Sequence, residues 1–323
     1  MVRIAGARLI AASAMALFAA DASAQRAAQV THLIVAFPPG GPVDFVGRVL
    51  ANQLEKELGQ TVIVENKPGA NGNIAAAFVA KAPPDGSVLF LSSAGAMAIS
   101  PALYEALPYD PQRDFTPVSL VVNNSTVFVV NPSNPAGSAV EFVRASLDAP
   151  NPIPIGSSGI GSIPHLTLEL FALSSKAHVM HVPYKGAAPV INDVIGNHVS
   201  GFFGDLPGLI GQIRGGKLKP IGIAAPKRHP LLPDVKTLAE QGIAGVESNN
   251  WYALIAPAKT PKETVDKLNA AVRRALQAEE VRRKLLDSGA EPSPSNPQQL
   301  AELIRADGAK WARIIREQKI KGE

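Results

Sequence analysis

The stretch Thr31–Asp44, which reads THLIVAFPPGGPVD, decides the fold class of this protein. Its apolar part, up to Phe37, predicts a buried strand, and the Pro-Pro-Gly-Gly-Pro run that follows predicts a turn. A helix is predicted after the turn, because apolar residues recur on one helical face at Phe45, Val49, Leu50, Leu54 and Leu58. Strand, turn and helix in this order are the beginning of a parallel βαβ unit.

The same order of elements returns along the chain. Thr61–Glu65 predicts a second strand, Gly72–Ala80 a helix of small residues, and Val88–Leu91 a third strand. Later strands are predicted at 152–155, 177–182, 199–204 and 218–224, and helices at 262–277, 279–288 and 298–320. Strands separated by helices predict an α/β fold with doubly wound sheets.

Two β-rich stretches, 118–130 and 248–256, interrupt this order. We interpret them as the places where the chain crosses between two lobes. The first lobe is then discontinuous, formed by 25–122 plus 253–323, and the second lobe is 123–252. Two domains in tandem are the alternative.

The N-terminal segment predicts export. Arg3 and Arg8 give the beginning of the segment a positive charge, and Leu9–Ala20 is an uncharged apolar run. Ala22-Ser23-Ala24 has the small-x-small pattern that signal peptidase cuts. The apolar run is shorter than the roughly 20 residues that cross a bilayer. We therefore expect residues 1–24 to be a cleaved signal peptide and the protein to be periplasmic, with a retained anchor helix as the alternative.

Composition excludes several classes of protein. The formal net charge is only +4, and the basic residues are scattered, which argues against a nucleic-acid partner. The chain has no cysteine, so it has no disulfide, thiol nucleophile or lipid-anchored N-terminal cysteine. No apolar run of membrane length follows the signal segment.

Four loops follow predicted strands, where doubly wound sheets bind ligands. In the first, 37–44, two glycines precede a helix start and leave backbone N–H groups facing outward. The second, 156–165, reads GSSGIGSIPH and offers hydroxyls and glycine amides. The third is Ser92–Gly95. In the fourth, 204–208, Asp205 either accepts from a ligand amine or hydroxyl or caps the next helix, and spacing alone favours the cap.

Known catalytic and cofactor motifs are missing. Residues 156–160 read GSSGI, with Ile160 where a Gly-x-Ser-x-Gly elbow needs glycine, so no such elbow is present. His178 and His181 lie three apart in a predicted strand and should face opposite ways, which is a poor zinc pair. Neither a dinucleotide motif nor a phosphate-binding loop occurs. We expect no catalytic residues, no metal and no cofactor.

Several motifs in fixed order carry a family resemblance. They are FPPGGPVD at 37–44, LGQTVIVENKPGANG at 58–72, APPDG at 82–86, HVPYKG at 181–186, APAKTP at 256–261 and Lys310-Trp311. Each motif is weak by itself. Together they resemble the solute-binding proteins of tripartite tricarboxylate transporters, often called the Bug family, over essentially the whole chain after the signal segment.

The resemblance implies a periplasmic-binding-protein type II-like fold, in which two lobes close around a ligand by a hinge motion. In this family a ligand carboxylate is held by backbone amides of the two lobes, with bridging waters. The ligand-binding positions implied here are Phe37, Gly40, Gly41, Asp44, Ser92, Ala94, Ser157, Ser158, Gly161, Ser162, His165 and Asp205.

The implied function is capture of a small carboxylate, such as a di- or tricarboxylate, an amino-acid-like acid or an aromatic acid, for a tripartite tricarboxylate-type uptake system. The implied partners are inner-membrane permease subunits or a sensor kinase, and we expect a monomer. Ile160–Pro164 departs from the family's smaller polar residues, which leaves the ligand's size open. Two alternatives stay open: presentation of the ligand to a sensor, and an acyl hydrolase built on Ser157 and His165 with Asp44 or Asp205.

Overall fold

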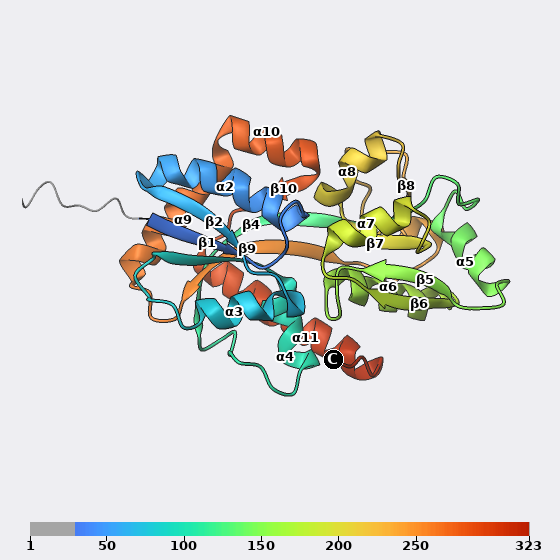
Figure 1. Cartoon of the computed structure of the whole chain (residues 1–323), viewed down its shortest axis with the longest axis horizontal. Helices are drawn as coiled ribbons and strands as arrows, with labels where there is room; N and C mark the ends of the chain where they lie inside the picture. Colours follow the sequence, from blue (N-terminus) through green and yellow to red (C-terminus); the bar gives the residue numbers. More distant parts are fainter. Residues whose placement is uncertain (1–29, 323) are drawn as a thin grey trace, which may run out of the picture.

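Two long antiparallel strands, β4 (Phe115–Val130) and β9 (Asn249–Pro257), run through the middle of the molecule and join its two lobes (Figure 1). The computed structural model describes residues 30–322, so the expected signal peptide lies outside the described residues. The strand order is β2-β1-β3-β9-β4-β7-β5-β6, and β8 and β10 both pair with β4.

The first lobe contains the parallel strands β1 (Val30–Val35), β2 (Thr61–Asn66) and β3 (Val88–Ser93), with β9 antiparallel to β3. The short strand β10 (Ala290–Pro292) pairs with β4. Its helices are α2 (Pro42–Leu58), α3 (Asn73–Val79), α4 (Ser100–Leu103), α9 (Lys262–Gln277), α10 (Glu279–Ser288) and α11 (Pro297–Glu317), with short turns at Ala70–Gly72 and Gly95–Ile99.

The second lobe is built on β5 (Ile153–Ser157), which is parallel to both β6 (Val179–Pro183) and β7 (Gly201–Asp205). The strand β8 (Lys219–Ile223) pairs antiparallel with β4. Its helices are α5 (Ala139–Leu147), α6 (Ile163–Ser175), α7 (Ala187–Ile195) and α8 (Leu206–Arg214), with a short turn at Ala239–Gln241.

The strand β4 belongs to both sheets. Its residues up to Ser125 pair with β9, and from Thr126 onward they pair with β7 and β8. This change of partner lies inside one of the two predicted crossings, and the expected α/β fold with doubly wound lobes is confirmed. The residue boundaries of the two lobes stay a prediction.

Each lobe buries apolar side chains on both faces of its sheet. Along β1, Leu33 and Val35 enter one core, whereas Ile34 enters the core on the opposite face. Along β4, Phe128 and Val127 divide between the two cores of the second lobe in the same way. This alternation explains why these strands are nearly continuous apolar runs, as sheets covered by helices on both faces require.

The structure adds elements that the sequence pattern did not reveal, namely the π-helical turn at Gly95–Ile99 and the strand β10. Asn296 caps α11 with a reciprocal capping box to Gln299, and the helix begins at Pro297, one residue before the predicted start. Within residues 30–322, no helix is both long and apolar enough to cross a bilayer.

Candidate binding site between the lobes

The loop between β1 and α2 brings two glycines to the start of a helix. Gly40 has a φ of +81°, a conformation that favours glycine, whereas Gly41 is extended with a φ of −82°. The N–H of Gly40 donates to Asp44 Oδ2 at 2.9 Å. Among the described residues, the N–H of Gly41 has no partner. Gly41 therefore offers a free amide at the positive end of α2.

The Asp44 carboxylate holds the shape of this loop. Its Oδ2 accepts from Gly40 N and Arg48 Nε, and its Oδ1 accepts from Asn66 Nδ2, each at 2.9 Å. Burial raises the pKa of Asp44, but the bonds from Arg48, Gly40 and Asn66 outweigh burial and leave the pKa below its usual value. Asn66 Nδ2 also donates to Phe37 O at 2.9 Å. Asp44 is thus occupied in positioning its own loop.

The loop between β5 and α6 is held by its own side chains in a similar way. The N–H of Gly161 donates to His165 Nδ1 at 3.1 Å, and that of Gly159 donates to Ser157 Oγ at 3.2 Å. Ser162 caps α6 by accepting from the backbone N–H of His165. In the described part of the chain, the N–H of Ser158 has no partner. Ser158 is therefore the counterpart of Gly41 in the second lobe.

Two stacked histidines support this second loop. The rings of His165 and His181 lie 3.9 Å apart at an angle of 15°, and His181 Nε2 lies 2.6 Å from Ser157 Oγ. Burial, and then the charge of His165, lower the pKa of His181 to about 4, so His181 is neutral at pH 7. Because Gly161 donates to His165 Nδ1, the hydrogen-bond pattern assigns a proton to His165 Nε2, which faces Glu169 Oε1 at 3.5 Å.

The acyl hydrolase alternative requires a hydrogen bond between Ser157 and His165. The partner of Ser157 is His181 and not His165, and the carboxylate beside the pair, Glu169, contacts His165. Asp44 and Asp205 form hydrogen bonds with other residues. The Ser157–His165 pair on which that alternative depends is therefore not formed, and the side chains stabilise the loop.

Asp205 stands at the start of α8, but its side chain makes no capping bond, so the expectation of a helix cap is wrong. Its Oδ2 instead accepts from Asn250 Nδ2 at 2.8 Å and from the Tyr252 hydroxyl at 2.5 Å. Its Oδ1 is buried and has no hydrogen-bond partner within residues 30–322. Burial raises the pKa of Asp205 to about 6, because the bonds from Tyr252 and Asn250 offset only part of the desolvation.

Gly41 and Ser158, the two residues with a free amide, both line one small inner cavity between the lobes, of about 30 Å³. A cavity of this size has room for at least one water molecule. Asp205 and Asn250 line the same cavity, and no Lys, Arg or His does so among the described residues. The remaining lining is apolar and comes from Phe37, Pro38, Pro42, Val43, Pro164, Ala187, Ala188 and Phe202.

An outer chamber of about 540 Å³ adjoins the inner cavity and shares Phe37, Pro38 and Ser158 with it. The two lobes touch across its wall, where Asn71 Nδ2 of the first lobe donates to Gly161 O of the second at 2.6 Å. A Cβ built on Gly186 would lie 3.2 Å from Pro38 Cδ. The lobes are therefore closed on one another in this structure.

Four of the residues expected from the sequence line the inner cavity: Phe37, Gly41, Ser158 and Asp205. The others lie in the surrounding loops and not in its lining, and for them ligand contact stays a prediction: Gly40, Asp44, Ser92, Ala94, Ser157, Gly161, Ser162 and His165. Ser92 is fully buried, and its hydroxyl donates to Ser93 O at 2.9 Å.

Sequence reasoning did not include among the binding-site residues four side chains that shape the site: Asn71, His181, Asn250 and Tyr252. Asn71 carries a signal, because it adopts a φ of 52° in a glycine-rich turn, a conformation that asparagine tolerates better than most residues. The polar Asn250 before an apolar strand is a weaker signal.

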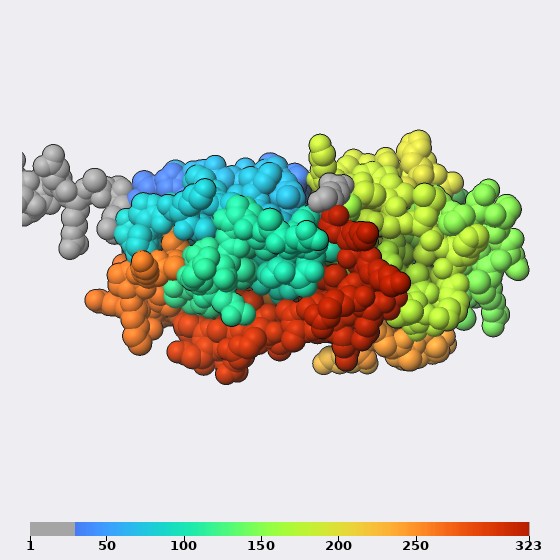
Figure 2. Space-filling model, turned by 90° about the horizontal axis from the view of Figure 1, so that it is seen from below, coloured from blue at the N-terminus to red at the C-terminus, as the bar shows by residue number. Residues whose placement is uncertain are grey.

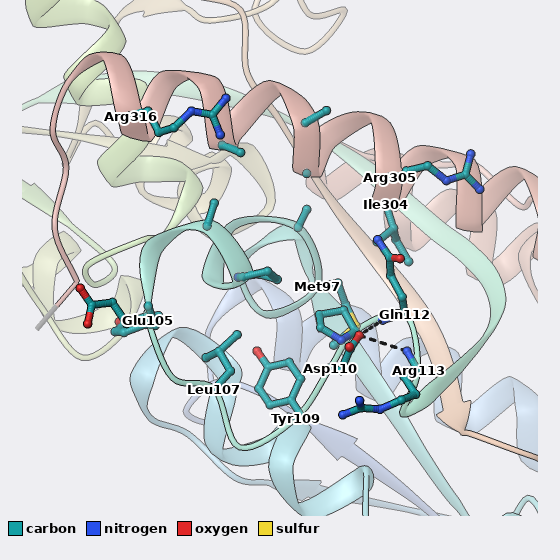
Figure 3. A pocket seen from close by; sticks show the side chains of 18 residues that line it. Met97, Glu105, Leu107, Tyr109, Asp110, Gln112, Arg113, Ile304, Arg305 and Arg316 are labelled. Carbon is teal, nitrogen blue, oxygen red and sulfur yellow. Dashed lines mark hydrogen bonds between the residues drawn. The ribbon is translucent and has the colours of Figure 1, made fainter.

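A second hollow, of about 880 Å³, lies between α11 and the segment 97–113 of the first lobe (Figure 3). Arg305 and Arg316 project from α11 at its edge, and the Asp110 carboxylate accepts the backbone N–H groups of Gln112 and Arg113. Seen from below, the C-terminal residues run beside this segment and reach the second lobe (Figure 2). None of the expected site residues lines this hollow, so we place the candidate site between the lobes.

The described residues were also compared with the arrangements that bind metal ions. Over the part of the chain that the structure describes, no three His, Asp or Glu side chains come together as a group that could hold a metal ion. The arrangement instead offers neutral amide donors and carboxylate and amide acceptors, which suit an organic ligand.

Comparison with known proteins agrees with this picture. A model of the tripartite tricarboxylate transporter family receptor matches residues 46–320. Protein BugT of Bordetella pertussis is 34% identical over 291 residues, covering 90% of this chain and 89% of BugT. The solved structure of R. palustris Rpa4515 with adipate has a TM-score of 0.88 and 32% identity, covering 92% of this chain and 99% of that chain. MatC from Rhodopseudomonas palustris with bound malate has a TM-score of 0.83 and 32% identity, covering 88% and 99%. The fold is the two-lobed, type II-like α/β fold that the resemblance implied.

The raised pKa of Asp205 predicts how the stability of the ligand-free protein depends on pH. The pKa is about 6 in the folded chain against 3.8 for an unperturbed carboxyl, so ionising Asp205 lowers the free energy of unfolding. The protein keeps its full stability below about pH 3.8 and loses this contribution as the pH rises through about 6. Asp205→Asn cannot ionise. We expect it to raise the free energy of unfolding at pH 7.5 by up to about 3 kcal/mol, with little gain near pH 4. Urea denaturation at both pH values measures this.

Asp44→Asn is the matched control, because the pKa of Asp44 is shifted in the opposite direction. Its ionised form stabilises the fold above the unfolded pKa, so this variant should be destabilised at pH 7.5 and less so in acid. A loss of stability in Asp205→Asn that is larger at pH 7.5 than at pH 4 would contradict the account.

Proposed function

This chain belongs to the tripartite tricarboxylate transporter receptor family, and from that premise we propose that it captures a small carboxylate in the periplasm for a tripartite tricarboxylate-type uptake system. The signal-like pattern of residues 1–24 supports export. The partners would be the inner-membrane permease subunits of that system, which would receive the ligand from the closed receptor.

One observation carries this proposal: Gly41 and Ser158, one from each lobe, line the same inner cavity, and the backbone N–H of each has no partner among the described residues. A carboxylate between them would accept a charge-assisted hydrogen bond from each lobe. Exclusion of water would strengthen both bonds. Since opening the lobes would separate the two amides, the ligand would favour the closed state by its higher affinity for it.

The start of α2 supplies positive potential to the cavity, whose described lining has no cationic side chain. Gly41 is the N-cap of this helix of 17 residues, and Ser158 lies in the loop before α6, four residues before the N-cap Ser162. Backbone N–H groups at such positions bind anions without a neighbouring lysine or arginine. The structures of relatives solved with adipate and with malate support a carboxylate as the ligand.

The outer chamber would hold the rest of the ligand. Its volume of about 540 Å³ suits a small organic acid that enters the inner cavity with one end. Among the described residues that line it, Lys185 is the one basic residue and no acidic residue is present, and Tyr104, Tyr184 and Ile160 add apolar surface. A second acidic group at the far end of the ligand would lie near Lys185.

Gly41→Val tests the first-lobe side of the site. A Cβ at Gly41 would meet only Pro38 O, at 3.5 Å, and the backbone is extended, so the fold should tolerate the change. The valine side chain would project beside the inner cavity and exclude the carboxylate. We expect carboxylate affinity to fall by about 100-fold or more, measured by calorimetry with whichever acid of a mono-, di- and tricarboxylate panel stabilises the wild type.

Gly211→Val is the matched control, since Gly211 lies on the exposed face of α8 with no atom within 4 Å of a Cβ. It should bind like the wild type. A ligand at 100 times its dissociation constant adds about 2.7 kcal/mol to stability, so a melting-temperature screen finds the ligand first. Failure of every carboxylate to raise the melting temperature, or equal affinity of the Gly41 variant, would count against the proposal.

Asn71→Gly tests the closure of the lobes. Glycine keeps the positive φ of this position and removes the side chain that bonds to Gly161 O across the cleft. Since that bond joins the two lobes across the cleft, we expect a dissociation constant raised about 3- to 10-fold, mainly through faster release. Stopped-flow and calorimetric measurements provide these values.

Asn197→Gly serves as the control for this change, because Asn197 is also an asparagine with a positive φ, 59°, but is exposed beyond α7. The account requires that it leave ligand release unaltered. An equal effect of both substitutions would show that the Asn71–Gly161 bond does not hold the lobes closed.

A further inference from the structure

The backbone of Gly161 connects the second-lobe loop to the first lobe. Its carbonyl oxygen accepts from Asn71 Nδ2 across the cleft at 2.6 Å, and its N–H donates to His165 Nδ1 at 3.1 Å. A Cβ built on Gly161 would lie 2.4 Å from Leu103 Cδ2, so the first lobe also packs closely against this residue. The position of Gly161 therefore decides whether Asn71 finds its acceptor.

The hydrogen bond from Gly161 requires a neutral His165. A neutral imidazole has one donor and one acceptor nitrogen, whereas an imidazolium donates from both. Protonation of His165 would therefore turn an Nδ1–H toward the N–H of Gly161, and two donors cannot bond to each other. His165 is only 5% exposed, so water does not replace the lost acceptor unless the loop shifts.

Glu169 compensates a positive charge on His165. It lies one turn along α6 and places its Oε1 3.5 Å from His165 Nε2. The hydrogen bond from His165 outweighs burial and lowers the pKa of Glu169 below its usual value, so this carboxylate is largely ionised at pH 5. In the described part of the chain, Glu169 is the one acidic group that pairs with His165.

The second titratable group that faces the His165 ring is His181 of β6, which stacks on it at 3.9 Å. Burial first, and then the charge of His165, lower the pKa of His181 to about 4, so His181 is still neutral at pH 5. Its Nε2 lies 2.6 Å from Ser157 Oγ, which holds the ring in place. Of the two stacked rings, His165 is thus the one placed to take up a proton on acidification.

We propose that His165 is a positioning residue that links closure of the lobes to pH. Neutral His165 holds Gly161 where Asn71 donates to it. Protonated His165 pairs with Glu169 and releases Gly161, which weakens the bond from Asn71, favours the open form and lets the bound acid leave. This inference rests on the proposed function and names a regulation of the same site: the receptor binds its ligand near neutral pH and releases it on acidification.

Acidification favours the open form because the open form takes up a proton that the closed form excludes. Through His165, the affinity for the ligand is therefore highest near neutral pH and falls toward pH 5. Asp205 acts in the opposite direction, because burial raises its pKa to about 6 and its protonation removes a negative charge beside an anionic ligand. The contribution of His165 is therefore measured as the difference between the wild type and variants that keep Asp205.

His165→Asn separates the acceptor from the titration, because an asparagine amide oxygen accepts from the Gly161 N–H at every pH and takes up no proton. Calorimetry on the full mature chain, with whichever carboxylate of the panel binds, should show that the wild type loses about 10-fold more affinity than this variant between pH 7.5 and pH 5.0. Glu169→Gln keeps His165 but removes the compensating charge, so it should also lose less affinity than the wild type. His178→Asn, which removes an exposed histidine of the same lobe, should keep the wild-type pH profile.

Nuclear magnetic resonance on the ligand-free protein tests the same step independently of binding. The Gly161 amide resonance should shift together with those of the His165 ring between pH 7.5 and pH 5.0 in the wild type, and should stay in place in His165→Asn. Equal pH profiles of the wild type and His165→Asn in calorimetry, or a Gly161 amide that does not follow His165, would overturn this inference and leave carboxylate capture standing. If no carboxylate binds at any pH, the proposed function fails, and the Gly161 resonance alone decides whether His165 positions the loop.

Discussion

The strands β4 and β9 pair from Phe115–Pro257 to Ser125–Asn249, and β4 then continues into the second sheet, where Thr126 pairs with Asp205. Because one unbroken strand belongs to both sheets, the loops at the carboxyl ends of β1 and β5 face each other across it. The same point brings Asp205 of β7 beside Asn250 of β9. The pairing of β4 with both β9 and β7 therefore determines where the cleft lies. It also brings Asp205 and Asn250 together and places the free amides of Gly41 and Ser158 on either side of the cleft.

The buried Asp205 carboxylate lowers the stability of the ligand-free protein. A carboxylate that burial desolvates, with one oxygen unpaired, lowers the stability of the empty closed form at neutral pH. Functional sites commonly retain such perturbed groups because a ligand satisfies them. The free amides of Gly41 and Ser158 act in the same direction, since an anion between them supplies the acceptors that both lack. In the proposed function, ligand binding and lobe closure are linked through these same amides.

Much of this was predictable from the sequence, and the failures have physical causes. Apolar runs and glycine-rich turns determine where strands end, so both ligand loops could be located. Which amide stays free depends on side chains that fold back from the first helical turn: Asp44 takes the N–H of Gly40, and His165 takes that of Gly161. Contacts between distant strands, such as Asp205 with Asn250, depend on strand register, which local spacing does not encode. For the same reason the pairing of Ser157 with His181, across β5 and β6, was not foreseen.

The most direct test of the account is a crystal structure of the protein with its bound acid. The account predicts that the ligand carboxylate lies within hydrogen-bond distance of both Gly41 N and Ser158 N, with the lobes closed and Asn71 bonded to Gly161. A carboxylate held by Arg305 and Arg316 in the hollow beside α11, or one that contacts a single lobe, would contradict it.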